Sequence, residues 1–239
     1  MIRFLQSGDT SLVIEFSTEM DRKIARQVLE LFRRVERAGI AGIVETVPTF
    51  RSLMVHYDPT KTTRRSLVPQ LEALLEGLEV AEGSGRVWHL PACYEGELAP
   101  DLDDVAQRTS LTPDEVVAQH SAETYLVYMV GFLPGFPYMG DLPQHLQLPR
   151  REEPRLRVPM GSVAIATAMT GVYTFESPGG WHLIGRTPVR IFDLRRQPAA
   201  LFEPGDEVCF VPISRAEFDA QERAAAAGTL TLRPLEATP

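Results

Sequence analysis

The stretch from Val130 to Phe192 most constrains the fold of this chain, because it is dense in glycine and proline yet rich in apolar side chains. Glycine reaches backbone angles that a Cβ forbids, and proline fixes φ and removes a hydrogen-bond donor. We therefore expect no regular helix and no central strand here, and the stretch is too apolar for a solvated linker. It predicts tight, packed loops that join short strands and line a surface concavity.

A basic island lies inside this stretch, where four arginines occur within eight residues. They are Arg150, Arg151, Arg155 and Arg157. The chain as a whole has a formal net charge of −8, so this island is a candidate anion site. Arginine presents a rigid fork of donors that suits carboxylate or phosphate. The alternative is that these side chains are solvated or paired with Glu152, Glu153 and other nearby acids, as surface arginines often are.

Composition limits the class of protein. The 239 residues suffice for one large domain or two ordinary ones, and no apolar run approaches the roughly 20 residues that a membrane helix needs. The first residues lack an apolar signal region. We therefore expect a cytoplasmic protein that binds no membrane, with Cys93 and Cys209 reduced. The negative charge also argues against nonspecific nucleic-acid binding, which needs a positive surface.

The first 83 residues predict a small α/β domain. The predicted strands are 2–6, 11–16, 43–47 and 53–57, and the predicted helices are 21–38 and 62–77. Apolar residues at helical spacing define the first helix, and Gly39 stands where a left-handed cap is expected. Pro69 marks either a first turn or a kink of the second. The ββαββα order predicts helices on one face of a sheet, and the polar run 82–85 predicts a linker.

The remainder, residues 84–239, predicts a barrel or sandwich, because many short strand candidates alternate with turns. The predicted strands are 87–90, 125–131, 163–168, 172–175, 181–185, 189–192, 207–211 and 230–232. The acidic stretch 95–115 predicts one short helix, and the sequence Thr112-Pro113-Asp114-Glu115 predicts the start of a helix that ends near Ala122. A last helix is expected over 214–227, with Gly228 as its cap.

Common catalytic motifs are absent from the sequence. It contains no G-x-x-x-x-G-K-[ST] phosphate loop, no G-x-G-x-x-G that opens a helix and no G-x-S-x-G elbow. The five histidines lack metal-ligand spacing, so we expect no metal site. His120, at the end of a well-capped helix, is the best candidate acid, base or donor. The alternative is a histidine favourably placed at a helix C-terminus. We expect His182 to face solvent, Cys93 to be structural, and Tyr128 and Tyr138 to be packing residues more readily than catalysts.

Five ordered motifs resemble the KipI/PxpB family, also called allophanate hydrolase subunit 1 or the 5-oxoprolinase B subunit. They are Gly131–Tyr138, Pro149–Arg151, Val158–Val163, Thr170–Tyr173 and Ser177–Pro188. The resemblance covers nearly the whole chain. It implies a ferredoxin-like α/β sandwich over residues 1–83 and a cyclophilin-like β-barrel over residues 84–239.

The resemblance also implies a function and partners. Such a chain pairs with a second subunit of the KipA/PxpC type (allophanate hydrolase subunit 2). With a PxpA-type subunit, the pair forms an ATP-dependent 5-oxoprolinase that opens 5-oxoproline to glutamate. One branch instead inhibits a sporulation histidine kinase. A third possibility is an allophanate hydrolase or urea carboxylase-like carboxyltransferase subunit that acts on another small amide or urea derivative.

The resemblance further implies a composite site for a small anionic substrate. The four arginines of the basic island would hold a carboxylate or phosphate, His120 would carry a proton, and Gly135, Phe136 and Tyr128 would shape the pocket wall. The resemblance implies that the complex requires ATP. Because this chain has no phosphate loop, we expect it to bind no cofactor alone and nucleotide activation to depend on the other subunits. Turnover is expected only together with its partners.

The sequence departs from the family pattern at four positions. Met160 replaces an alanine, and Thr167, Met169 and Thr174 replace glycine, glutamine and proline. Glutamine both donates and accepts hydrogen bonds, whereas methionine offers only a weakly accepting sulfur. A site built from hydrogen bonds discriminates strongly between substrates, so these positions bear on catalytic competence and substrate identity.

Overall fold

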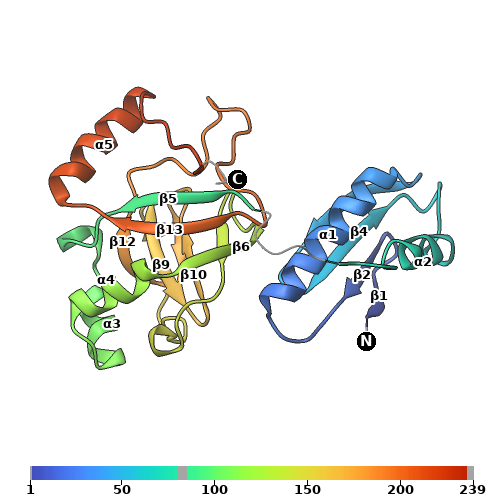
Figure 1. Ribbon diagram of the computed structural model, residues 1–239, viewed down its shortest axis with the longest axis horizontal. Coiled ribbons are helices and arrows are strands. Elements are labelled where there is room, and N and C mark those ends of the chain that lie inside the picture. The colour runs from blue at the N-terminus through green and yellow to red at the C-terminus, as the bar shows by residue number, and fades with distance from the viewer. Residues whose placement is uncertain (1, 80–84, 236–239) are drawn as a thin grey trace. The chain divides into compact units, whose positions relative to one another are not determined.

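The chain forms two units, residues 1–84 and 85–239 (Figure 1). Each has its own hydrophobic core. The computed structural model describes residues 2–79 and 85–235. Of the predicted linker 82–85, only Gly85 falls within the described residues. No helix of the described residues is long and apolar enough to cross a membrane.

The first unit is a four-stranded antiparallel sheet in the order β1-β2-β4-β3, with two helices packed into one core. Its elements are β1 (Arg3–Ser7), β2 (Ser11–Glu15), α1 (Arg22–Ala38), β3 (Ile43–Pro48), β4 (Ser52–Tyr57) and α2 (Arg64–Ala73). Strands β2 and β3 both pair with β4 and are joined by α1, which makes a split β-α-β unit. The predicted element order of this unit is therefore confirmed.

Local signals account for the helix ends of this unit. The Asp21 carboxylate accepts a hydrogen bond from the Ile24 amide at 3.0 Å, and Gly39 ends α1 at φ 55°. The second helix is shorter than predicted, since it begins after its cap Thr63 and ends at Ala73. Pro69 lies in its interior, so the first-turn placement of this proline is wrong.

The second unit contains a curled seven-stranded sheet in the order β12-β9-β10-β7-β6-β13-β5 (Figure 1). Strands β8 and β11 form a separate pair. Its strands are β5 (Val87–Ala92), β6 (Thr124–Val130), β7 (Pro137–Met139), β8 (Arg155–Val158), β9 (Ser162–Ala166), β10 (Met169–Val172), β11 (Ser177–Gly179), β12 (His182–Arg186) and β13 (Glu207–Pro212). Its helices are η1 (Gly96–Leu98), α3 (Leu102–Thr109), α4 (Pro113–Ala122), η2 (Gln144–Leu146) and α5 (Arg215–Ala227). The fold is thus α/β with a barrel-like sheet.

Capping chemistry fixes α4 where it was predicted. The Thr112 hydroxyl accepts from the Glu115 amide, and the Glu115 carboxylate accepts in return from the Thr112 amide at 2.7 Å. The same reciprocal pair of bonds joins Ser214 and Glu217 at the start of α5, and Gly228 ends that helix at φ 77°. Helix α4 therefore follows its predicted cap, and α5 starts one residue later than predicted because Ser214 is its cap.

The middle strand of the large sheet contradicts one expectation. Strand β7 lies inside the glycine- and proline-rich stretch and pairs with both β6 and β10, so the prediction of no central strand there is wrong. The strand has only three residues, and Pro137 is the first of them. Proline is tolerated at the first residue of a strand, because the missing donor costs least there.

Three further predicted strands are wrong. Residues 172–175 contribute only Val172, the last residue of β10, and 189–192 and 230–232 form no strand. Backbone groups in the last two segments bond elsewhere. The Arg196 guanidinium donates to the carbonyls of Arg190 and Ile191, and the Leu230 amide donates to the Ala224 carbonyl at the end of α5. These groups are therefore satisfied without a sheet partner.

Candidate functional site

Two arginines of the basic island converge on one buried carboxylate. Asp101, at the start of α3, is 3% exposed and accepts hydrogen bonds from Arg151 Nη1 at 3.1 Å and from Arg155 Nη1 at 2.9 Å. The Leu183 amide donates to the same carboxylate at 2.7 Å. Because a buried carboxylate needs such partners, Asp101 fixes both guanidinium groups against β12.

Backbone contacts hold residues 149–157, the arginine segment, against residues 179–182. The Arg151 amide donates to the Gly180 carbonyl at 2.8 Å, and Arg155 pairs with Gly179 between β8 and β11. His182 lies fully buried, with its Nε2 2.9 Å from the Pro149 carbonyl oxygen, to which it donates. The expectation that His182 faces solvent is therefore wrong, since its ring supports the arginine segment from beneath.

The other two arginines of the island behave differently from this pair. Arg157 forms a two-pronged pair with Glu176, and both side chains are largely exposed. Arg150 is exposed and forms no ion pair with any residue that the structure describes. The alternative to an anion site was that these arginines pair with nearby acids. Three of the four arginines do form such pairs, but with Asp101 and Glu176 and not with Glu152 or Glu153. Only Arg150 retains an uncommitted guanidinium.

An aromatic cluster lies beside this uncommitted arginine. Its members are Phe136, Tyr138, Tyr173 and Trp181, whose ring centroids are 4.8–5.9 Å apart in four contacting pairs. Three of these rings are buried, and Tyr138 is half-buried. Tilted and edge-to-face pairs of this kind add stability beyond area burial. The cluster therefore forms a rigid aromatic wall.

The tyrosine hydroxyls of the wall are neutral donors. Burial raises the pKa of both Tyr138 and Tyr173, and the nearby positive charge of Arg150 opposes that rise in each. One free guanidinium next to two neutral phenols is an arrangement that can receive a carboxylate or phosphate oxygen.

Gly179→Ala is expected to displace Tyr173 and destabilise the second unit by about 1–3 kcal/mol, the usual range for overpacking. A Cβ at this position would overlap the Tyr173 hydroxyl and ring. Thermal unfolding followed by tryptophan fluorescence checks the stability, and Gly180→Ala is the matched control because a Cβ there meets its nearest neighbour only at 3.6 Å. Equal stability of the two variants would contradict this packing.

His120 lies elsewhere, in the core of the second unit. It is fully buried, with Nδ1 3.0 Å from the Tyr94 hydroxyl and Nε2 2.9 Å from the Thr170 hydroxyl. Thr170 donates its own proton to the Ala164 carbonyl, which assigns the imidazole proton to Nε2. Burial lowers the pKa of His120 to about 3, so the ring is neutral at physiological pH. Both ring nitrogens bond to core hydroxyls and neither bonds to the arginine segment.

The other predicted site residues lie in or next to the sheet. Tyr128 is a buried β6 residue whose ring fills the space left by Gly140, and its hydroxyl donates to Asp141 at 2.7 Å. Gly135 is buried at φ 74°, where a Cβ would crowd Phe192. Phe136 belongs to the aromatic wall. Of these three, only Phe136 has a ring contact with Trp181, which belongs to the residues 179–182 that hold the arginine segment.

The four departures from the family pattern are dispersed. Thr167 occupies the turn between β9 and β10 at φ 53°, and Met169 begins β10 with 8% of its surface exposed. Thr174 is buried, and its hydroxyl has no hydrogen-bond partner among the described residues. Met160 lines a cavity beside α5. Sequence reasoning missed Asp101, because nothing in the linear order links it to Arg155, 54 positions later.

Within the described ranges, no group of three or more His, Cys, Asp or Glu side chains could hold a metal ion. Both cysteines are free thiols, with Cys93 buried and Cys209 half-buried. Burial raises the pKa of the Cys93 thiol, which disfavours the reactive thiolate. The chemistry available at the arginine segment is therefore binding by donors.

Curated relatives resemble the chain over most of its length. The 5-oxoprolinase B subunit of Bacillus subtilis (strain 168) is 37% identical over 229 residues, which cover 90% of this chain and 94% of that protein. The 5-oxoprolinase B subunit of Haemophilus influenzae is 44% identical over 169 residues, covering 71% of this chain and 79% of that protein.

Two solved structures are longer than this chain. TTHA0988 matches with a TM-score of 0.75 and 34% identity, covering 89% of this chain and 40% of that one. The K. lactis urea amidolyase matches with a TM-score of 0.83 over 99% of this chain and 16% of that one, and at 23% identity this likeness shows the fold alone. The chain thus spans less than half the length of either structure.

The family model for the carboxyltransferase domain, subdomain C and D, matches residues 2–202. Its match extends through the arginine segment, the aromatic wall and Asp101, and the curated relatives described above agree with it. The chain therefore belongs to the carboxyltransferase subdomain C and D family and, within it, to the B subunits of 5-oxoprolinase.

Proposed function

We propose that this chain is the B subunit of an ATP-dependent 5-oxoprolinase and contributes half of a composite site that opens 5-oxoproline to glutamate. The observation that carries the proposal is the uncommitted Arg150, whose positive charge acts on the hydroxyls of Tyr138 and Tyr173. Relatives at 37–44% identity are named as B subunits of 5-oxoprolinase, which supports the choice of substrate.

The geometry suits the two halves of this substrate. The Arg150 fork would hold the carboxylate of 5-oxoproline, and the phenol of Tyr138 would donate a further hydrogen bond to it. The aromatic wall would pack against the five-membered ring. Arg151 and Arg155 would act indirectly, because their bonds to Asp101 keep the segment that bears Arg150 in one conformation. Positioning of this kind supplies much of what a binding subunit contributes to catalysis.

Hydrolysis of the cyclic amide would be completed by other polypeptides. The chain has no phosphate loop, so ATP would be used by the complex with a KipA/PxpC-type subunit and a PxpA-type subunit. The naming of the relatives as one lettered subunit of an enzyme supports the existence of such partners. The greater length of TTHA0988 is consistent with a partner fused in one polypeptide. A cytoplasmic location fits the two free thiols.

We extend the proposal to the domain families of the two units. The split β-α-β unit with β1 at the sheet edge fits a ferredoxin-like sandwich over residues 1–83 whose strand order is permuted. The curled seven-stranded sheet fits a cyclophilin-like barrel over residues 84–239.

The purified chain alone is expected to show no 5-oxoproline-dependent ATP hydrolysis, whereas the chain mixed with its two partner subunits is expected to turn over. Phosphate release with 5-oxoproline, with urea and without substrate measures this. Robust turnover by the isolated chain would contradict a composite site. Turnover with urea alone would favour the carboxyltransferase alternative, and inhibition of kinase autophosphorylation by a chain inactive in all mixtures would favour the regulator.

In the reconstituted complex, Arg150→Ala is expected to lower kcat/KM for 5-oxoproline by about 10- to 100-fold, the usual cost of losing a charged hydrogen bond. Arg157→Ala is the matched control, since Arg157 belongs to the same island but pairs with Glu176 at the surface. Steady-state kinetics at constant ionic strength compare the two. Equal kinetics of both variants would remove Arg150 from the site.

A further inference from the structure

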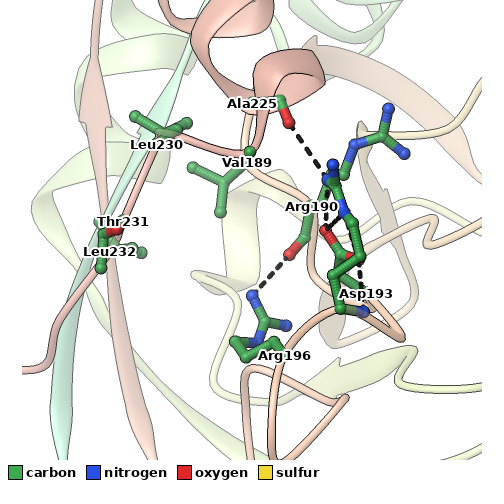
Figure 2. A pocket seen from close by; sticks show the side chains of 10 residues that line it. Val189, Arg190, Asp193, Arg196, Ala225, Leu230, Thr231 and Leu232 are labelled. Carbon is green, nitrogen blue, oxygen red and sulfur yellow. Dashed lines mark hydrogen bonds and ion pairs between the residues drawn. The ribbon is translucent and has the colours of Figure 1, made fainter.

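A groove runs along the second half of α5, apart from the arginine segment of residues 149–157. It consists of two adjoining cavities of about 280 and 320 Å³, which share Val189, Arg190 and Ala225 as lining residues. Figure 2 shows the first of them, with Leu230 and Leu232 on one side and Asp193 and Arg196 on the other. Neither cavity is lined by any residue of the aromatic wall or of the basic island.

The sequence explains why this space stays open. Helix α5 ends in four alanines, 224–227, whose short side chains leave room between the helix and residues 186–196. The facing wall is firmly held. The Arg186 Nε donates to the Met160 carbonyl at 2.9 Å, and Gly161 lies so close to the Thr187 carbonyl that a Cβ would approach it to 2.5 Å. The groove is thus preformed, as binding sites for small molecules usually are.

The groove is cationic in an otherwise acidic chain. Five arginines line it, against the carboxylates of Asp193 and Glu222. They are Arg186, Arg190, Arg195, Arg196 and Arg223. Two of the five are committed. The Arg195 guanidinium is paired with Asp193. The Arg196 guanidinium, labelled in Figure 2, donates to backbone carbonyls.

The remaining three arginines all line the second cavity. Arg186 uses only its Nε, so its two Nη groups remain as donors. The guanidinium groups of Arg190 and Arg223 form no hydrogen bond or ion pair with any of the residues that the structure describes. The hydrogen bonds from Arg195 lower the pKa of the Asp193 carboxyl most, and the positive charge of Arg190 adds to that effect. Three guanidinium groups around one cavity repel one another, and an anion between them would relieve that repulsion.

We propose that this groove binds a small organic anion, with its carboxylate or phosphate held by Arg186, Arg190 and Arg223. The apolar part of the ligand lies in the adjoining cavity, against Val189, Leu230 and Leu232. Because Arg190 lines both cavities, it joins the polar and apolar halves of the site. The groove is distinct from the arginine segment proposed to hold 5-oxoproline.

Calorimetric titration of the full chain with three probes of one shape tests the proposal. Phenyl phosphate and phenylacetate carry an anion on an aromatic ring, and benzyl alcohol carries the ring without charge. Saturable binding of at least one anion and none of the alcohol is expected. If only phenyl phosphate binds, the preferred head group is a phosphate, and if only phenylacetate binds, it is a carboxylate. Absence of saturable binding by both anions, or equal binding of the alcohol, would overturn the proposal.

Variants locate the binding in the groove. Arg190→Gln and Arg223→Gln are each expected to lower the affinity for the anion at least tenfold. Arg223 is exposed on α5, so that variant keeps the fold even where Arg190→Gln perturbs it. Arg33→Gln, an exposed arginine on α1 of the first unit, is the matched control and is expected to bind as the unaltered chain does. Unchanged affinity in Arg223→Gln and Arg190→Gln would place the anion elsewhere and refute the site.

Discussion

Asp101→Asn is expected to lower the free energy of unfolding of the second unit by about 3–5 kcal/mol, the range for breaking a buried ion pair by removing one partner. The carboxylate is 3% exposed and accepts hydrogen bonds from Arg151, Arg155 and the Leu183 amide. Asparagine retains one acceptor oxygen but no charge. The guanidinium groups of the two arginines, both partly buried, would lose their counter-charge.

Urea unfolding followed by fluorescence measures this effect in one unit, because both tryptophans of the chain, Trp88 and Trp181, belong to the second unit. Glu176→Gln, which removes the exposed partner of Arg157, is the control and is expected to change stability little. In the reconstituted complex, Asp101→Asn should also lose most 5-oxoproline turnover, since the segment bearing Arg150 loses its anchor. A stability like that of Glu176→Gln would show that the buried carboxylate contributes no net stabilisation.

Acidification from pH 7 to pH 4.5 is expected to cost about 3 kcal/mol of stability through His120 alone. Burial lowers the pKa of His120 from 6.5 to about 3. Between these two pH values the histidine is therefore protonated in the unfolded chain and neutral in the folded chain. The stabilisation is complete above pH 6.5 and is lost at about 1.4 kcal/mol per pH unit as the pH falls toward 3.

His120→Gln provides the comparison that isolates this residue. Glutamine retains a donor and an acceptor for Tyr94 and Thr170 but does not titrate, so the variant should be less stable at pH 7 and should depend less on pH between 6.5 and 4.5. Urea midpoints measured across that range supply both slopes. Parallel pH profiles of stability for the two proteins would mean that the titration of His120 does not cause the pH dependence. A flattened profile with full turnover at pH 7 would assign this histidine to the core and not to catalysis.

Local chemistry made much of the fold predictable. The ends of α1, α4 and α5 follow from residues within a few positions of each boundary, such as Asp21, Thr112 and Ser214 with their partners. Strands β2 and β4 were also located from nearby residues, because apolar side chains alternate with period two at Leu12, Ile14 and Phe16 and at Leu53, Val55 and Tyr57.

What sequence reasoning missed depends on contacts between distant residues. The arginine cluster was visible, but the carboxylate that anchors it lies 50 positions before Arg151. The burial of His182 accompanies its hydrogen bond to the carbonyl of Pro149, 33 positions earlier, which no spacing indicates. Strand β7 exists because β6 and β10 flank it, although its own three residues carry weak strand signals.

The short strand β12 has a consequence for how this protein tolerates change. Its second residue, Leu183, donates its amide to Asp101, and its last, Arg186, reaches the α5 groove, about 10 Å further along an extended backbone. A bulge already separates these two positions, where the pairing with β9 shifts between Leu183 and Gly185. Deleting one residue there would turn the following side chains of β12 to the opposite face of the sheet. This one change would disrupt both the Asp101 contact and the α5 groove. We therefore expect related sequences to carry insertions and deletions in β12 less often than in the loops around it.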